Sequence, residues 1–196
     1  PTDMKSVYAK YSEWYESRLR KNDVNFTNFH ARVYGDRVSY ADFATQFRAE
    51  HFDPNQWADL FKRSGARYVV LTSKHHDGFA LFDSRADDFN SMNSAARRDF
   101  VAEFAAACRE YGLGVGFYYS PGSWRFVVPR VSGTPESAAR MKDVAHAQIR
   151  ELMSAYGKVD ILWYDGVWRP PFDGSAPAGE AADFWEAEKI NAMVRE

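Results

Sequence analysis

The sequence has very little cysteine: Cys108 is the only one, so a disulfide bond within the chain is excluded. It also has no apolar run long enough to cross a membrane and no signal-peptide pattern. The two signs of charge are nearly balanced, because 25 Lys and Arg stand against 27 Asp and Glu, a formal net charge of −2. This balance argues against a nucleic-acid partner and against binding to an anionic membrane.

Aromatic residues, in contrast, are plentiful. They make up 16% of the 196 residues, with six Trp, eleven Tyr and fifteen Phe. A hydrophobic content of 45% is enough for a packed core, so the high number of aromatic residues needs a separate explanation. It fits either an unusually aromatic core or a pocket that stacks on flat ligands or on the apolar faces of sugars.

Three short apolar runs predict buried parallel strands, at residues 68–72, 115–119 and 161–164. They are continuous rather than alternating, as expected for strands that are covered on both faces. A helix precedes each strand and ends at a glycine, namely Gly65, Gly112 and Gly157. The predicted helices begin at Asp53-Pro54, near Asp99 and near Thr134-Pro135, and a last helix is expected at 181–195.

Helices that alternate with buried strands indicate βα units. Reactive or aromatic residues directly follow each strand, in the segments 74–77, 120–124 and 165–168. A (β/α)₈ barrel of the TIM type builds its active site from these strand ends, whereas a Rossmann-like sheet usually shows a glycine-rich phosphate loop that is absent here. We therefore predict a TIM-like barrel, of which residues 1–196 form one partial catalytic domain of about three to four units.

Asp165 is the strongest candidate for chemistry, since it follows a strand and lies between Trp163 and Trp168. A carboxylate there could attack an anomeric carbon, although a turn or helix-capping Asp would look similar. His75 and His76 follow the first strand beside Asp77. Adjacent residues on an extended chain point to opposite sides, so we expect one histidine in the pocket and one packed.

The pair of histidines leaves three readings open: hydrogen bonding to sugar hydroxyls, a metal site with Asp77, or purely structural residues. His-His-Asp lacks the spacing of an established zinc motif. Tyr11, Glu13 and Trp14 place aromatic rings around a carboxylate near the start of the chain, which an amphipathic helix would also explain.

Several segments, taken in order, strongly resemble the retaining α-L-fucosidases, from about residue 11 to the end of the chain. The most specific is KHHDGF at 74–79, and FDPNQWADLFK at 52–62, YYS at 118–120 and YDG at 164–166 support it. The resemblance implies that Asp165 is the nucleophile and that His75 and His76 bind fucose hydroxyls. It further implies a sugar pocket that contains Tyr11, Glu13, Trp14, Tyr119 and Trp163.

The resemblance also implies a fucosylated oligosaccharide or glycoconjugate as substrate, no cofactor and no metal, and a secreted, periplasmic or lysosomal protein; it leaves oligomer formation open. The family's first barrel strand, its C-terminal units and its general acid/base should lie outside these residues, so we expect no turnover from this chain alone. Two alternatives remain: a non-catalytic fucose-binding fragment, and a metal-dependent hydrolase that uses His75, His76 and Asp77.

Overall fold

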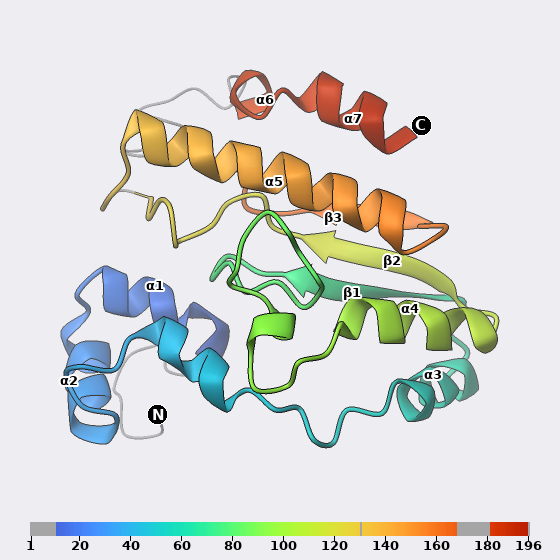
Figure 1. Cartoon of the computed structure of the whole chain (residues 1–196), viewed down its shortest axis with the longest axis horizontal. Helices are drawn as coiled ribbons and strands as arrows, with labels where there is room; N and C mark the ends of the chain where they lie inside the picture. The colour runs from blue at the N-terminus through green and yellow to red at the C-terminus, as the bar shows by residue number, and fades with distance from the viewer. Residues whose placement is uncertain (1–10, 130, 168–180, 196) are drawn as a thin grey trace.

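A computed structural model describes residues 11–129, 131–167 and 181–195 of the chain. The centre of this described part is a parallel sheet of three strands, β1 (Tyr68–Lys74), β2 (Gly114–Tyr119) and β3 (Ile161–Tyr164), in the order β1-β2-β3 (Figure 1). The predicted parallel strands in sequential order are therefore confirmed. The number of units in a closed barrel stays a prediction, because the described residues supply only these three strands.

Helices connect and flank the strands. The longer ones after the N-terminal region are α3 (Pro54–Arg63), α4 (Phe100–Glu110), α5 (Pro135–Ala155) and α7 (Ala187–Arg195). The N-terminal region contains η1 (Ser12–Trp14), α1 (Tyr15–Arg20), α2 (Val24–Val33) and η2 (Tyr40–Gln46), and two short helices, η3 (Ser91–Asn93) and α6 (Ala181–Phe184), complete the set. Among the helices described, none is long and apolar enough to span a membrane.

Local sequence signals set the helix ends as predicted. The side chain of Asp53 accepts hydrogen bonds from the backbone of Asn55 and Gln56, and Thr134 caps α5 through Ser137. The glycines that follow α3, α4 and α5 all have positive φ, the conformation that ends a helix without steric cost. The helix predicted at 181–195 is instead divided into α6 and α7, with Glu186 at a φ of 50° in the break.

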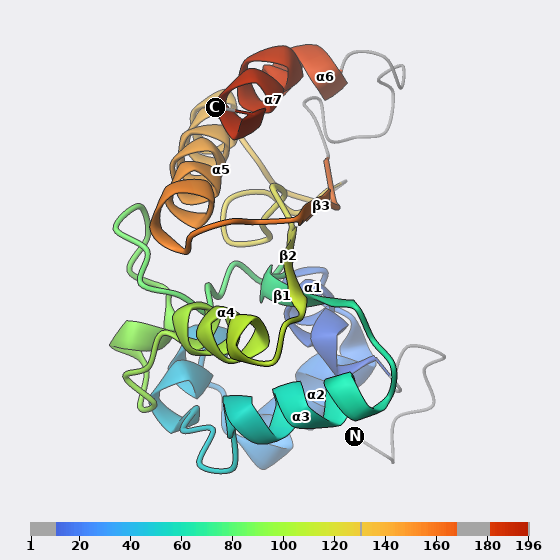
Figure 2. The ribbon, with the colours of Figure 1, turned by 90° about the vertical axis from the view of Figure 1, so that its right-hand side faces the viewer.

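One face of the sheet packs against helices. Figure 2 looks nearly along the strands and shows α4 and α5 on the same side of the sheet. The strand residues on this side are Val115, Phe117 and Tyr119 of β2, which join the hydrophobic core with side chains from α4 and α5. Helix α3 packs beside α4 and α7 packs beside α5, so the four helices follow one another in a row along this side of the sheet.

The opposite face is covered less than the sequence predicted. Tyr68 and Trp163 lie on this side and are 56% and 57% exposed, respectively. The continuous apolar strands led us to expect burial on both faces, but the described residues cover only the helical side. Trp163 pairs in register with Tyr118, so the uncovered face carries two neighbouring aromatic residues near the carboxyl edge of the sheet.

Candidate active site

The carboxyl ends of the three strands bring the candidate residues together. His75 and His76 follow β1, Tyr118 lies near the end of β2, and Asp165 follows β3. The backbone N–H of Asp165 donates to the carbonyl of Tyr119 at 3.2 Å, which continues the parallel pairing one residue past β3. The predicted convergence of the two histidines and Asp165 at one edge of the sheet is confirmed, since His76 Nε2 lies 4.0 Å from Asp165 Oδ2.

Asp165 is held as an accessible carboxylate. Its side chain is 52% exposed, the Tyr118 hydroxyl donates to Oδ2 at 2.8 Å, and the Gly166 N–H donates to Oδ1 at 2.7 Å. The bond from Tyr118 is the main reason why the pKa of Asp165 lies below its usual value, and Gly166 and the two histidines act in the same direction against partial burial. The group is therefore ionised at neutral pH, as a nucleophile must be.

The two histidines lie against each other. Their ring centroids are 4.1 Å apart, and the ring of His75 also stacks on Tyr118 at 6.0 Å with an interplanar angle of 15°. The expectation that they point to opposite sides was wrong, because β1 ends at Lys74 and the chain turns there, with Gly78 N–H donating to the His75 carbonyl. The strand rule applies only to extended residues.

Burial keeps both imidazoles neutral. It lowers the pKa of His76, which is 5% exposed, to about 4; the neighbouring His75 adds to this effect and Asp165 opposes it. Burial also lowers the pKa of His75, against the nearby carboxylates of Asp77, Asp165 and Glu13. The Nδ1 atom of His75 is buried and has no hydrogen-bond partner among the described residues. At neutral pH each ring therefore carries hydrogen on only one of its two nitrogens.

Tryptophans line the other side of the histidines. The ring of Trp14 is 6.1 Å from that of His76 and 5.2 Å from that of Trp124, and Trp124 in turn lies 5.3 Å from His76. Glu13, in the same turn as Trp14, is exposed, and Tyr11 is 50% exposed. The N-terminal segment predicted to flank the sugar therefore does reach the histidines, mainly through Trp14. Trp168 lies outside the described residues.

Tyr119 does not face this site. Its side chain is fully buried on the helical side of the sheet, where its hydroxyl donates to Gln148 of α5 at 2.8 Å. The neighbouring Tyr118 takes the place that we expected Tyr119 to occupy. The sequence did hold a signal: Val115, Phe117 and Tyr119 alternate with Gly114, Gly116 and Tyr118, so the bulky apolar set faces the helices and Tyr118 faces away.

The position of Asp77 does not support a metal site formed with His75 and His76, because its carboxylate oxygens accept hydrogen bonds from other groups. Its Oδ2 accepts from the Tyr40 hydroxyl at 2.9 Å and its Oδ1 accepts from the Phe79 N–H at 3.3 Å. Within residues 11–129, 131–167 and 181–195, no group of three or more His, Cys, Asp or Glu side chains could hold a metal ion. The Asp77 carboxylate instead fixes η2 to the turn after β1.

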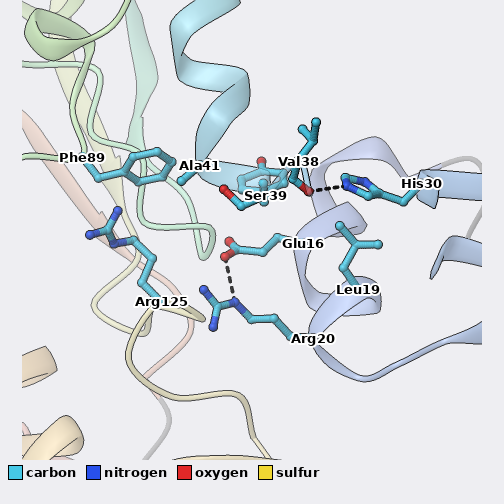
Figure 3. Close-up of a pocket in the computed structure, with 10 residues that line it drawn as sticks. Glu16, Leu19, Arg20, His30, Val38, Ser39, Ala41, Phe89 and Arg125 are labelled. Atoms are coloured by element: carbon cyan, nitrogen blue, oxygen red, sulfur yellow. Dashed lines mark hydrogen bonds and ion pairs between the residues drawn. The ribbon is translucent and has the colours of Figure 1, made fainter. Parts of the chain in front are cut away.

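A separate cavity of about 590 Å³ lies between α1, η2 and the loop that follows β1 (Figure 3). Its buried carboxylate is Glu16, whose Oε1 accepts from Arg20 at 2.8 Å while Oε2 is sealed from solvent without a partner among the described residues. Burial raises the pKa of Glu16 to about 7, although Arg20 and Arg125 act in the opposite direction. Because the pKa of this buried carboxylate differs from its ordinary value, Glu16 couples the stability of the fold to pH.

A family model described as alpha-L-fucosidase matches residues 3–196. A putative alpha-L-fucosidase from Caenorhabditis elegans is 33% identical over 192 residues, covering 96% of this chain and 38% of the relative. The alpha-L-fucosidase of Branchiostoma floridae is 38% identical over 173 residues, covering 85% of this chain and 38% of that protein.

Solved structures agree with the sequence comparison. The crystal structure of Thermotoga maritima alpha-fucosidase superposes with a TM-score of 0.76 at 35% identity, covering 95% of this chain and 42% of that one. An alpha-L-fucosidase isoenzyme 1 from Paenibacillus thiaminolyticus gives a TM-score of 0.70 at 30% identity, covering 93% and 41% of the two chains. The chain thus spans about two fifths of the length of the relatives that it matches.

Proposed function

Because this chain belongs to the α-L-fucosidase family, we propose that the protein hydrolyses terminal α-L-fucosyl linkages of glycoconjugates with retention of configuration, with Asp165 as the nucleophile. The observation that carries the proposal is the state of Asp165. It is an ionised and accessible carboxylate at the carboxyl edge of a parallel sheet, hydrogen-bonded to Tyr118 and close to two neutral histidines. Strand ends of this kind build the active sites of (β/α) barrels.

The reaction has two displacements. Asp165 attacks the anomeric carbon, the bond to the leaving oxygen breaks, and an acid gives that oxygen a proton. The resulting glycosyl ester on Asp165 is then hydrolysed by water, which is activated by the same second carboxyl group. Tyr118 orients the attacking oxygen of Asp165 and keeps the carboxylate ionised before the attack.

The surrounding residues would bind the sugar. His75 and His76 are neutral and present ring nitrogens beside Asp165, so they can hydrogen-bond to hydroxyl groups that gain acidity as positive charge develops on the ring. Trp14 and the exposed Trp163 supply flat apolar surfaces near the same edge. The roles of Tyr11 and Glu13 remain those implied by the family resemblance.

Retention requires a second carboxyl group about 5–5.5 Å from the nucleophile. The family resemblance assigns this acid/base to a residue outside residues 1–196. Within the described part of the chain, Glu13 is a carboxylate close enough to His75 to influence its pKa. Glu13 is therefore the residue to test first if the 196-residue chain hydrolyses a fucoside unaided.

Proton NMR during hydrolysis of 4-nitrophenyl α-L-fucoside tests the proposal. We expect α-L-fucose to form first and then to equilibrate with the β anomer. Initial release of the β anomer would show that the reaction is a single inverting displacement and not a double displacement. Binding of fucose without any hydrolysis by the full-length protein would favour the non-catalytic alternative.

A further inference from the structure

Ser120 contacts His76, one of the two histidines beside Asp165. It directly follows β2 and is fully buried, and its Oγ lies 2.5 Å from His76 Nδ1 and 2.7 Å from the carbonyl oxygen of Gly122. Both contacts are short enough to be hydrogen bonds. The position of one proton on Ser120 therefore decides which nitrogen of His76 carries hydrogen.

The Gly122 carbonyl settles the direction of these bonds. A carbonyl oxygen can only accept, and two oxygens 2.7 Å apart without a proton between them would repel each other. The single hydroxyl proton of Ser120 thus goes to Gly122. Ser120 Oγ must then accept from His76, which places hydrogen on Nδ1 and leaves Nε2, in the neutral ring, with a lone pair.

We propose that Ser120 is a positioning residue that fixes His76 in its Nδ1–H tautomer, so that Nε2 accepts a hydrogen bond from a sugar hydroxyl. The identity of that donor rests on the proposed fucosidase function; the tautomer does not. Nε2 is the nitrogen that lies 4.0 Å from Asp165 Oδ2. In the other tautomer, Nε2–H would point its positive end at the nucleophile and compete for its charge.

The backbone around Ser120 is fixed from three strand ends. Lys74 of β1 donates to the Ser120 carbonyl through Nζ, and the Ser120 N–H donates to the Lys74 carbonyl at 3.1 Å. Gly122 N–H donates to the carbonyl of Gly166, which follows Asp165. The hydroxyl therefore has little freedom to turn from Gly122 to another acceptor.

Gly166 completes the enclosure. Its φ is +67°, and a Cβ atom there would lie 2.5 Å from Cε1 of His76 and 2.9 Å from Ser120 Oγ. Any side chain at 166 would thus displace the pair. The low pKa of His76, about 4, agrees with a ring that stays neutral at neutral pH.

The tautomer of His76 determines which replacements of the sugar hydroxyl the site tolerates. A hydroxyl that meets Nε2 must donate its hydrogen, so replacement of that hydroxyl by hydrogen or by fluorine removes the bond, because neither substituent donates. A histidine in the opposite tautomer would tolerate fluorine better, because fluorine can accept. Monodeoxy and monofluoro fucosides therefore report on the tautomer as well as on the contact.

Two-bond ¹⁵N–¹H correlation spectra of the protein labelled with ¹⁵N-histidine test the tautomer without any need for turnover. At pH 7 we expect Nδ1 of His76 at the protonated and Nε2 at the unprotonated position, with the signal assigned by its loss in His76→Gln. Ser120→Ala should give Nε2–H or an average of the two tautomers, and Ser120→Thr should restore the wild-type pattern. A wild-type spectrum with Nε2–H would overturn the proposal.

Steady-state kinetics provide a second test of the proposal. Ser120→Ala should lower kcat/KM for the parent fucoside roughly tenfold or more, and should shrink the ratio between parent and the sensitive monodeoxy fucoside. Ser73→Ala is the matched control, because Ser73 is equally buried and its hydroxyl donates to a backbone carbonyl, that of Tyr118. If Ser120→Ala lowered kcat/KM equally for both substrates and left the tautomer of His76 unchanged, Ser120 would have only a structural role. A fixed Nδ1–H tautomer in a protein without fucosidase activity would instead reject the proposed function alone.

Discussion

The hydroxyl of Tyr118 donates to Oδ2 of Asp165 at 2.8 Å, across the gap between the ends of β2 and β3. The two residues lie 47 positions apart in the sequence, and the parallel register brings them together by pairing Tyr118 with Trp163. The bond favours the charged form of Asp165, because a hydrogen bond to a carboxylate stabilises its anion.

Removal of Asp165, the proposed nucleophile, should abolish most of the activity. In the full-length protein, Asp165→Gly should lower kcat for 4-nitrophenyl α-L-fucoside by roughly three orders of magnitude or more, since one covalent step is lost. The side chain is half exposed, so the melting temperature should change little. Added azide should restore part of the release and give a fucosyl azide of inverted configuration.

The control for that variant is Asp160→Asn. Asp160 lies just before β3, at the opposite end of the same strand from Asp165, where it accepts from the Val115 N–H and pairs with Lys158. Its replacement should leave kcat unchanged. Near-normal turnover in Asp165→Gly would remove Asp165 from the mechanism.

Tyr118→Phe should change the pH dependence of activity. The Tyr118 hydroxyl lowers the pKa of Asp165, so its loss lets that pKa rise, and the acid limb of the kcat/KM profile should move to higher pH. Tyr119→Phe is the matched variant: it loses the bond to Gln148 on the helical side and should cost about 1 kcal/mol of stability without moving the profile. A shift caused by Tyr119→Phe rather than by Tyr118→Phe would contradict the assignment.

The histidines should act through binding and not through a metal. His75→Ala and His76→Ala should each lower kcat/KM by roughly 10- to 100-fold, because a buried sugar hydroxyl loses a partner worth about 1–3 kcal/mol. His51→Ala, at an exposed position, serves as the control. Prolonged treatment with EDTA should leave the wild-type rate unchanged, and a loss that zinc restores would revive the metal-dependent alternative.

Glu16 should make the protein less stable as the pH rises from about 4.5 to 7. Its pKa is raised from 4.5 to about 7 in the folded state, so in this window the folded protein keeps a proton that the unfolded chain has lost. The effect is at most about 3 kcal/mol, and the opposing influence of Arg20 is already contained in the pKa of about 7.

Urea unfolding at pH 5 and at pH 8 measures this effect. The low pKa of His76 gives the opposite trend between pH 4 and 6.5, so the informative quantity is the difference between wild type and Glu16→Gln. Glu16→Gln should gain stability relative to wild type as the pH rises, whereas the exposed Glu110→Gln should follow wild type. Parallel curves for wild type and Glu16→Gln would show that the Glu16 pKa is close to its ordinary value.

The sequence by itself determined the parts that depend on near neighbours. The three strands, their order and the helix caps at Asp53 and Thr134 follow from short-range rules of periodicity, hydrogen bonding and backbone conformation. Asp165 could be singled out because a polar residue directly after a buried strand in a βα unit is placed at the carboxyl edge of the sheet.

Tertiary structure decided which side chains meet there. The choice between Tyr118 and Tyr119 depends on which face of β2 the helices cover, and the stacking of His75 on His76 depends on the turn after Lys74. The proton on His76 depends on Ser120, which is 44 residues away in the sequence. Charge states, tautomers and ring contacts arise from desolvation and from groups that are distant in the chain, so only the packed structure fixes them, because no local pattern encodes the dielectric surroundings or the partner of a buried group.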